Sequence, residues 1–183
     1  HEVITRINTT IASGSTCYTD SNGREMQKRV FNYRPTWKLN QTEPVAGNYY
    51  PVNAMAYIKD SSAQLTVLTD RSEGGGSLTS GELEIMVHRR LMYDDSRGVG
   101  EPLNETQGIT PYPNPHRIGT GLEIRGTHKW QVASPSTAMA AARPGADRMF
   151  FRPIAYVAPL TTSPSAYIGD HVTTASWLNA SLP

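Results

Sequence analysis

Two adjacent carboxylates and a guanidinium, in Asp94-Asp95-Ser96-Arg97-Gly98, form the segment of this chain best equipped for chemistry. Adjacent aspartates on an extended chain point apart. Asp94 and Asp95 are therefore unsuited to be the paired acid and nucleophile of a hydrolytic site, whose carboxyl groups flank one bond about 5–5.5 Å or more apart. An arginine beside carboxylates has two other uses: an ion pair that stiffens a turn, or a rigid fork of donors aimed at a sugar hydroxyl or a catalytic carboxylate. The residue types leave both uses of Arg97 open.

The remaining polar residues predict no metal or phosphate site in this chain. The five histidines, at positions 1, 88, 116, 128 and 171, show no spacing typical of metal ligands. Gly74-Gly75-Gly76 lacks the Lys-Ser/Thr and the following helix of a phosphate-binding loop, so we interpret it as a flexible surface loop. Cys17 is the single cysteine, which excludes a disulfide within the chain. We expect it to be a small buried apolar residue, with a bridge to another chain as the alternative.

Five aromatic residues offer a second kind of binding surface, because aromatic rings pack against the C–H face of sugars. They are Tyr33, Trp37, Tyr49, Tyr50 and Trp130. Aromatic residues in strands also build protein cores. The sequence alone does not separate these two uses.

Composition excludes several classes of protein. The 183 residues carry a formal net charge of +1, which argues against the basic footprint of a nucleic-acid-binding protein. The longest apolar run, Ala138 to Ala142, is far shorter than the roughly 20 residues of a membrane span. Neither nucleic acid nor a membrane is therefore an expected partner. The chain opens at His1, directly in what looks like a strand, which we interpret as a fragment or a processed chain of something larger.

Four Asn-x-Ser/Thr sequons indicate the compartment. They begin at Asn8, Asn40, Asn104 and Asn179, all beside turn-like sequence. One sequon in a Ser/Thr-rich chain is weak support for glycosylation, whereas four in one domain favour a glycoprotein of the secretory route.

Alternating apolar and polar residues predict the strands that must position these groups. In the clearest case Leu83, Ile85 and Val87 face a core, and the intervening residues, Glu84 among them, face solvent. Further strands are predicted over 52–58, 65–67, 122–132 and 154–157, with a hairpin turn at 60–62. Short strands separated by turns are typical of a mainly β fold, an antiparallel β-sandwich or part of one.

Helical signal is confined to two short segments. One runs over 134–142, where Pro144-Gly145 should stop it, and the other covers a turn or two of 23–29. A Pro-rich connector near Gly108 divides the chain into residues 1–107 and a continuation, 108–183, whose topology is left open.

Long segments of residues 2–107 follow one another as they do in a known family. Examples are Tyr33-Arg34-Pro35-Thr36-Trp37-Lys38-Leu39-Asn40-Gln41-Thr42 and Asp94-Asp95-Ser96-Arg97-Gly98-Val99-Gly100-Glu101-Pro102-Leu103, joined by 18–24, 43–52, 65–72 and 83–91. The chain resembles the C-terminal β-rich portion of the lysosomal acid α-mannosidases, glycoside hydrolase family 38. The resemblance is specific over residues 2–107 and thin beyond them, where 121–128 looks like the family's next strand.

This resemblance implies a lysosomal retaining glycosidase that removes terminal α-linked mannose from N-glycans. It implies a galactose-mutarotase-like β domain, or part of one, in which Arg97, Asp95 and Asp94 line the mannose site. Zinc and the catalytic aspartates are implied for a partner chain of the same processed precursor, so this chain alone is expected to be inactive and to bind no metal. The competing hypothesis is a stand-alone carbohydrate-binding or scaffold β-sandwich module of a secreted glycoprotein.

Overall fold

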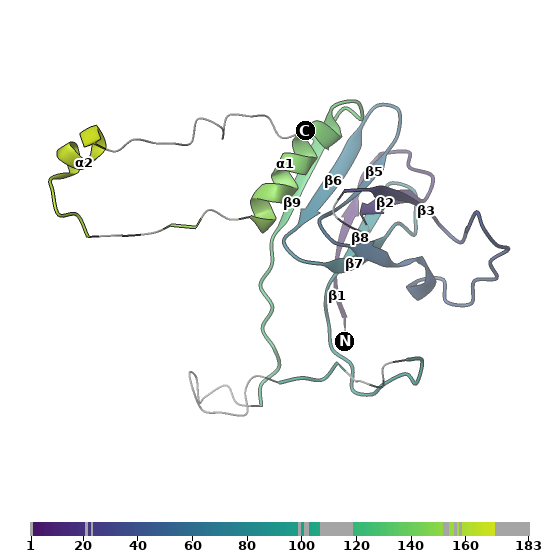
Figure 1. The fold of residues 1–183 in the computed structure, drawn as a ribbon. Coiled ribbons are helices and arrows are strands. Elements are labelled where there is room, and N and C mark those ends of the chain that lie inside the picture. Colours follow the sequence, from purple (N-terminus) through teal and green to yellow (C-terminus); the bar gives the residue numbers. More distant parts are fainter. Residues whose placement is uncertain are drawn as a thin grey trace. The chain divides into compact units, whose positions relative to one another are not determined.

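The computed structural model of the chain describes residues 2–20, 22, 24–98, 100, 103–106, 119–151, 154, 155, 157 and 159–170. By their internal contacts the residues divide into two units, His1–Arg152 and Pro153–Pro183. The first unit holds all strands of the described residues and the longer helix (Figure 1). The second holds a short helix, α2 (Pro164–Asp170).

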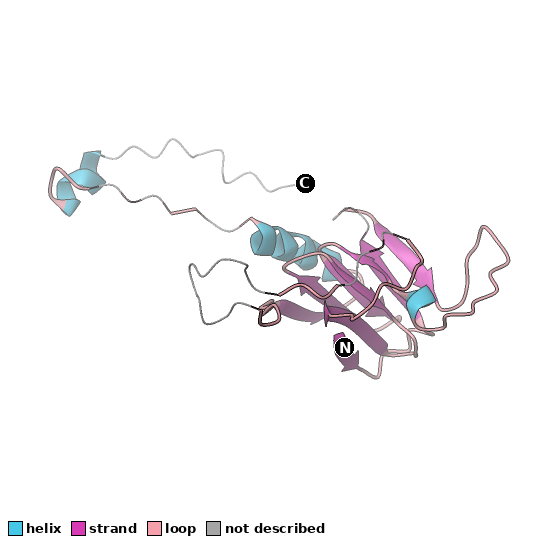
Figure 2. Ribbon diagram, turned by 90° about the horizontal axis from the view of Figure 1, so that it is seen from below, coloured by secondary structure: helices cyan, strands magenta, loops and turns pink. Residues whose placement is uncertain are grey.

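Two antiparallel sheets build the first unit (Figure 2). The first sheet has the order β1-β8-β7-β4, with β1 (Glu2–Asn8), β8 (Glu82–Arg89), β7 (Glu73–Gly76) and β4 (Tyr50–Val52). The second has the order β3-β2-β5-β6-β9, with β3 (Met26–Val30), β2 (Thr16–Asp20), β5 (Met55–Lys59), β6 (Gln64–Thr69) and β9 (His128–Ala133). A 3-10 helix, η1 (Ala46–Asn48), precedes β4. Because β4 and β7 lie over β2, and β8 lies over β5, the predicted antiparallel β-sandwich is confirmed.

Strand alternation creates the core between the two sheets. Leu83 and Ile85 on β8 are fully buried, and they pair across the ladder with Ile7 and Thr5 of β1. Apolar side chains from other segments complete this interior: Ile11, Cys17, Val52, Ala56, Ile58, Leu65 and Val67. Burying one large aliphatic side chain contributes about 1.5–3 kcal/mol. The inward faces therefore hold the sandwich together, and the outward face of the first sheet can carry polar groups.

Helix α1 (Ala138–Phe150) covers the outer face of the second sheet, and it is longer than predicted. Its side chains Ala142, Ala146 and Met149 pack against Leu68 and its neighbours. The sequence predicts that Pro144 ends the helix, because proline removes one backbone hydrogen bond. That prediction is wrong, since buried contacts on both sides of Pro144 outweigh the loss of one bond.

Strand β7 forms where the sequence predicts a flexible loop, so that prediction is wrong as well. A Cβ atom on Gly75 would lie 2.8 Å from the carbonyl oxygen of Glu84 and 3.2 Å from Cγ2 of Val52. Glycine therefore allows β7 to fit closely between β4 and β8. Glycine is disfavoured in strands, but the approach of the neighbouring backbone requires it here.

The single strand predicted over 52–58 is two strands, β4 and β5, in different sheets. The buried carboxylate of Asp20 holds the crossing point, because its Oδ1 accepts hydrogen bonds from the backbone N–H groups of Asn53, Ala54 and Met55, each at 3.0 Å. Alternate residues stay buried on both sides of the crossing, so the sequence pattern gives no sign of the break.

Other expectations for strands and turns have mixed outcomes. The hairpin at 60–62 is confirmed, since β5 and β6 pair on either side of it. Residues 26–30 form β3 rather than a helical turn, because they pair with β2. The strand predicted over 122–132 begins only at His128, where the ladder with β6 ends. Ile154, Ala155 and Val157 lie outside any strand. The Pro-rich connector lies almost wholly outside the described residues, and the division at residue 108 stays a prediction.

Candidate functional site

The Asp94–Gly98 segment forms a turn after β8 that its own carboxylates shape. Asp94 Oδ1 accepts a hydrogen bond from the backbone N–H of Ser96 at 2.8 Å, and Asp95 Oδ1 accepts one from the N–H of Arg97 at 3.1 Å. Ser96 has a φ of 57°, the left-handed conformation that such side-chain-to-backbone bonds support. The two aspartates thus fix the backbone that presents Arg97.

The guanidinium of Arg97 pairs with Glu43 rather than with an aspartate of its own turn. The distance from Nη2 of Arg97 to Oε1 of Glu43 is 3.8 Å, and the Arg97 side chain is 72% exposed. An exposed pair of this length contributes little to stability. The Asp–Arg ion pair considered from the sequence is therefore not what stiffens the turn, and Arg97 keeps donors available to a ligand.

Glu43 also lines a cleft of about 700 Å³ on the outer face of the first sheet. Its floor is the outward face of β1 and β8, which carries Arg6 and Glu84, and its wall is the loop that leads into β4. The lining residues are Glu2, Ile4, Arg6, Glu43, Pro44, Val45, Ala46, Tyr49, Gly74, Glu84, Met86 and Arg89. Carboxylates, guanidinium groups and a phenol alternate with small apolar surfaces there, which suits a ligand rich in hydroxyl groups or a polar protein surface.

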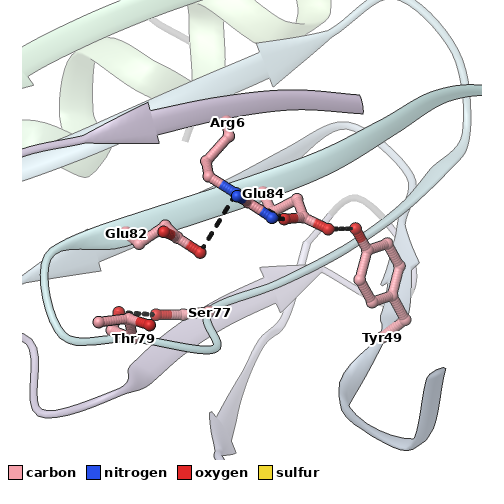
Figure 3. A network of polar contacts seen from close by, with 6 residues as sticks. All are labelled: Arg6, Tyr49, Ser77, Thr79, Glu82 and Glu84. Carbon is pink, nitrogen blue, oxygen red and sulfur yellow. Dashed lines mark hydrogen bonds and ion pairs between the residues drawn. The ribbon is translucent and has the colours of Figure 1, made fainter. Parts of the chain in front are cut away.

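Glu84 is the centre of a buried network on the floor of this cleft (Figure 3). Its Oε2 accepts hydrogen bonds from Nε of Arg6 at 2.8 Å and from Nη2 of Arg6 at 2.5 Å. Its Oε1 accepts one from the hydroxyl of Tyr49. The Glu84 side chain is 3% exposed, whereas its place on the polar side of the strand predicts a solvated carboxylate. Both oxygens are engaged, so Glu84 positions neighbouring groups rather than acting as an acid or a nucleophile.

The five aromatic candidates do not form a single stacking surface. Tyr49 belongs to the cleft, and the ring of Tyr50 carries the guanidinium groups of Arg29 and Arg34 at 4.5 and 5.0 Å from its centroid. Tyr33 and Trp37 lie exposed beyond β3. Trp130 lies on β9, at the opposite edge of the second sheet, so only Tyr49 contributes to the candidate site.

The predicted sequons are accessible wherever the structure describes them. Asn8, Asn40 and Asn104 are all exposed, and Asn179 lies outside the described residues. Their glycosylation stays a prediction. Cys17 is a free cysteine, buried as predicted, and this burial raises the pKa of its thiol to about 11.

Among the residues that the structure describes, no group of three or more His, Cys, Asp or Glu side chains is placed to hold a metal ion. None of the helices described there is long and apolar enough to span a membrane. His128, a scattered histidine in the sequence, pairs with the nearly buried Glu73 at 2.7 Å.

Comparisons with known proteins bear on this geometry. The family model of the glycosyl hydrolases family 38 C-terminal domain matches residues 1–97. The lysosomal α-mannosidase of Bos taurus is 58% identical over 139 residues, which are 76% of this chain and 13% of the relative. That of Homo sapiens is 51% identical over 158 residues, 86% of this chain and 14% of the relative.

The similarity reaches beyond animals. The α-mannosidase of the plant Canavalia ensiformis is 47% identical over 135 residues, 74% of this chain and 13% of the relative. The chain thus covers only 13–14% of the length of these relatives. All the cleft-lining residues, and the turn from Asp94 to Arg97, lie within the matched stretch, residues 1–97.

Proposed function

Because the chain belongs to glycosyl hydrolase family 38, whose C-terminal domain matches residues 1–97, we propose that it is the non-catalytic β chain of a lysosomal-type α-mannosidase. The assembled enzyme hydrolyses terminal α-linked mannose from N-glycans with retention of configuration. This chain supports the catalytic chain of the same precursor. The support for this proposal is the identity of 51–58% to two lysosomal α-mannosidases of which the chain covers 13–14%.

One observation carries the proposed role at the mannose site: Arg97 is highly exposed and lies at the rim of the cleft through its contact with Glu43. A rigid turn with an exposed guanidinium is suited to reach into a site built mainly by another chain. An arginine keeps its charge at every relevant pH and presents planar donors. In the proposed enzyme Arg97 holds mannose hydroxyls or orients a catalytic carboxylate, and Asp94 and Asp95 act by fixing its turn.

Zinc belongs, in this proposal, to the catalytic chain. The residues described here do not fit such a metal, because they include no cluster of three or more potential ligands. No step of the reaction is therefore assigned to zinc through this chain. The compartment is proposed to be the lysosome, reached by the secretory route, which the exposed sequons at Asn8, Asn40 and Asn104 would allow.

The test is made in the assembled enzyme, with the chain co-expressed with the remainder of an α-mannosidase precursor. We expect the two parts to co-purify one to one and to cleave an aryl α-mannoside. Arg97→Lys keeps the charge but loses the fork, and should lower kcat/KM by about ten- to a hundredfold, or about 1.4–2.8 kcal/mol. Arg97→Ala should lower kcat/KM further.

A matched control is Arg148→Lys on α1, an exposed arginine on the helix that packs on the second sheet. It should leave kcat/KM unchanged. Normal kinetics with a lowered melting temperature in Arg97→Lys would assign Arg97 to structure alone. A lone chain that binds mannosides tightly and never joins a catalytic partner would instead support the carbohydrate-binding module.

A further inference from the structure

The second sheet of the sandwich has one more strand than the first, and the extra strand lies at the β9 edge. The second sheet has five strands and the first has four, and the stacking places β4 and β7 over β2 and β8 over β5. Following this order, β1 comes over β6. Among the described residues, the first sheet reaches the inner face of β9 at its first residue, where Glu73 of β7 pairs with His128 at 2.7 Å. Beyond His128 the inner face of β9 is exposed at Trp130 and Val132.

The segment that contains β9 is amphipathic over twice the length of the strand. From residue 122 to residue 132, apolar side chains recur at even positions, interrupted by Gly126 and by His128, which pairs with Glu73, and odd positions carry polar residues. The even positions are Leu122, Ile124, Gly126, His128, Trp130 and Val132. Trp130 and Val132 are 59% and 70% exposed although they lie on the inward side of β9. A period of two with exposed apolar residues is typical of a strand that packs against another sheet.

Two spaces lie along this edge, between the apolar segment and the first sheet. Thr5 and Val87 face Ile124 and Trp130 across a space of about 250 Å³. A second space, of about 160 Å³, lies between Val3 of β1 and Leu122. Strands β1 and β8 line both spaces on one side and residues 121–130 line them on the other, with Leu103 and Glu105 closing the end of the second space. The spaces therefore lie where the inward side chains of a strand beside β1 would insert.

Strand β1 is itself an open edge. Its seven residues, Glu-Val-Ile-Thr-Arg-Ile-Asn, contain no proline or glycine, and β8 is the only strand of the described residues that pairs with it. Soluble proteins cover or interrupt long regular edges, because unpaired N–H and C=O groups recruit further strands. The ladder with β8 shifts register once, between Val3 and Ile4, so the regular part of this edge is residues 4–8. A regular edge of this length next to an exposed apolar face is suited to accept a strand.

We propose that a further β-strand, supplied by the part of an α-mannosidase polypeptide that this chain does not contain, pairs with the free edge of β1. Its inward side chains cover Ile124, Trp130 and Val132. The occupant alternates apolar and polar residues, since one of its faces meets this apolar stripe and the other continues the outer face of the first sheet. The inference rests on the proposed function for the source of the strand. The relatives are long enough to contain such a strand outside the matched region, because this chain covers only 13–14% of their length.

Hydrogen exchange measured by mass spectrometry tests the proposal in the co-expressed assembly and in the 183-residue chain alone. Some amides of Glu2–Asn8 exchange freely in the lone chain. In the assembly their exchange rate should fall by about tenfold or more, because edge amides become hydrogen-bonded. Acrylamide quenching of Trp130 fluorescence, read against a Trp130→Phe variant, should fall in parallel. Ile124→Lys should weaken assembly, and this substitution lies outside every described strand.

Trp37→Lys is the matched control, because Trp37 is 62% exposed and belongs to the segment that follows β3, the strand at the other edge of the second sheet. It should leave the exchange of β1 unchanged. An active assembly in which β1 and Trp130 stay accessible overturns this inference and leaves the proposed function standing. Protection already present in the lone monomer, or appearing only as the lone chain dimerises, overturns it as well. If β1 is protected in the assembly but Arg97→Lys has normal kinetics, only the proposed role of Arg97 is contradicted and the strand proposal stands.

Discussion

The guanidinium of Arg6 donates two hydrogen bonds to one carboxylate oxygen of Glu84, from a residue 78 positions away in the chain. The other oxygen accepts a hydrogen bond from the hydroxyl of Tyr49, 35 positions away. One buried carboxylate thus joins β1, β8 and the end of the loop that forms the cleft wall. Its removal should therefore loosen the cleft as well as the sheet.

Glu84→Gln should lower the melting temperature of the chain by roughly 3–8 °C, because the half-exposed guanidinium of Arg6 loses its buried counter-charge and the phenol of Tyr49 loses a strong acceptor. Circular dichroism during heating measures the shift. Glu82→Gln is the control, since Glu82 contacts Arg6 only at 3.5 Å. Equal shifts in both variants would contradict a special role for Glu84.

Gly75→Ala should destabilise the sandwich by about 1–3 kcal/mol, because the added methyl group meets the backbone of β8 and the neighbouring backbone cannot yield cheaply. Urea unfolding gives this difference. At Gly74 the nearest atom to an added Cβ is Cδ1 of Tyr49 at 3.4 Å, an ordinary contact. Gly74→Ala should therefore change stability by no more than about 1 kcal/mol in either direction, and a larger loss there than at Gly75 would refute the packing argument.

Asp60 should stabilise the folded chain at neutral and mildly acidic pH. Backbone N–H groups of Ala12, Ala63 and Ser62 hold the pKa of its carboxyl well below the usual range. A lowered folded-state pKa gives stability that is fully present above the unfolded value, about 3.9, and is lost as pH falls through the folded value. The urea midpoint of Asp60→Asn should lie below that of the parent chain at pH 7 and at pH 5. The gap should narrow below about pH 4, and a gap that widens there would contradict this assignment.

Cys17 should be silent toward thiol reagents until the chain unfolds. Burial raises the pKa of its thiol to about 11, so almost no thiolate is present at pH 8, and the sulfur is covered. A disulfide reagent should label no thiol in the native chain and one in urea. Ser61→Cys, at the exposed turn between β5 and β6, should add one thiol that reacts at once. Rapid native labelling of Cys17 would disprove its burial.

Local patterns predicted the strand around Leu83 and Ile85, the hairpin at Asp60 and the burial of Cys17, because each depends on residues close in sequence. The sandwich followed from the number of short strands, and the family from long specific segments. These features need no knowledge of distant contacts.

The features that were missed all depend on partners far away in the chain. Glu84 looks solvated until Arg6 and Tyr49 cover it. Gly75 looks like a loop residue until β4 and β8 approach it. Arg97 was correctly placed in a turn after a strand, but its partner Glu43 follows no spacing rule, so only the fold could identify the contact.

The pairing of β1 with β8 also sets the order in which the chain can fold. The hairpin of β5 and β6 closes across a few residues and can form early, whereas β1 must wait until β8 has been synthesised. Contacts of such high sequence separation slow folding, because the entropy cost of closing a long loop comes before any contact stabilises the closed chain. During synthesis β1 therefore stays without its partner β8 for the whole time that the first half of the chain emerges.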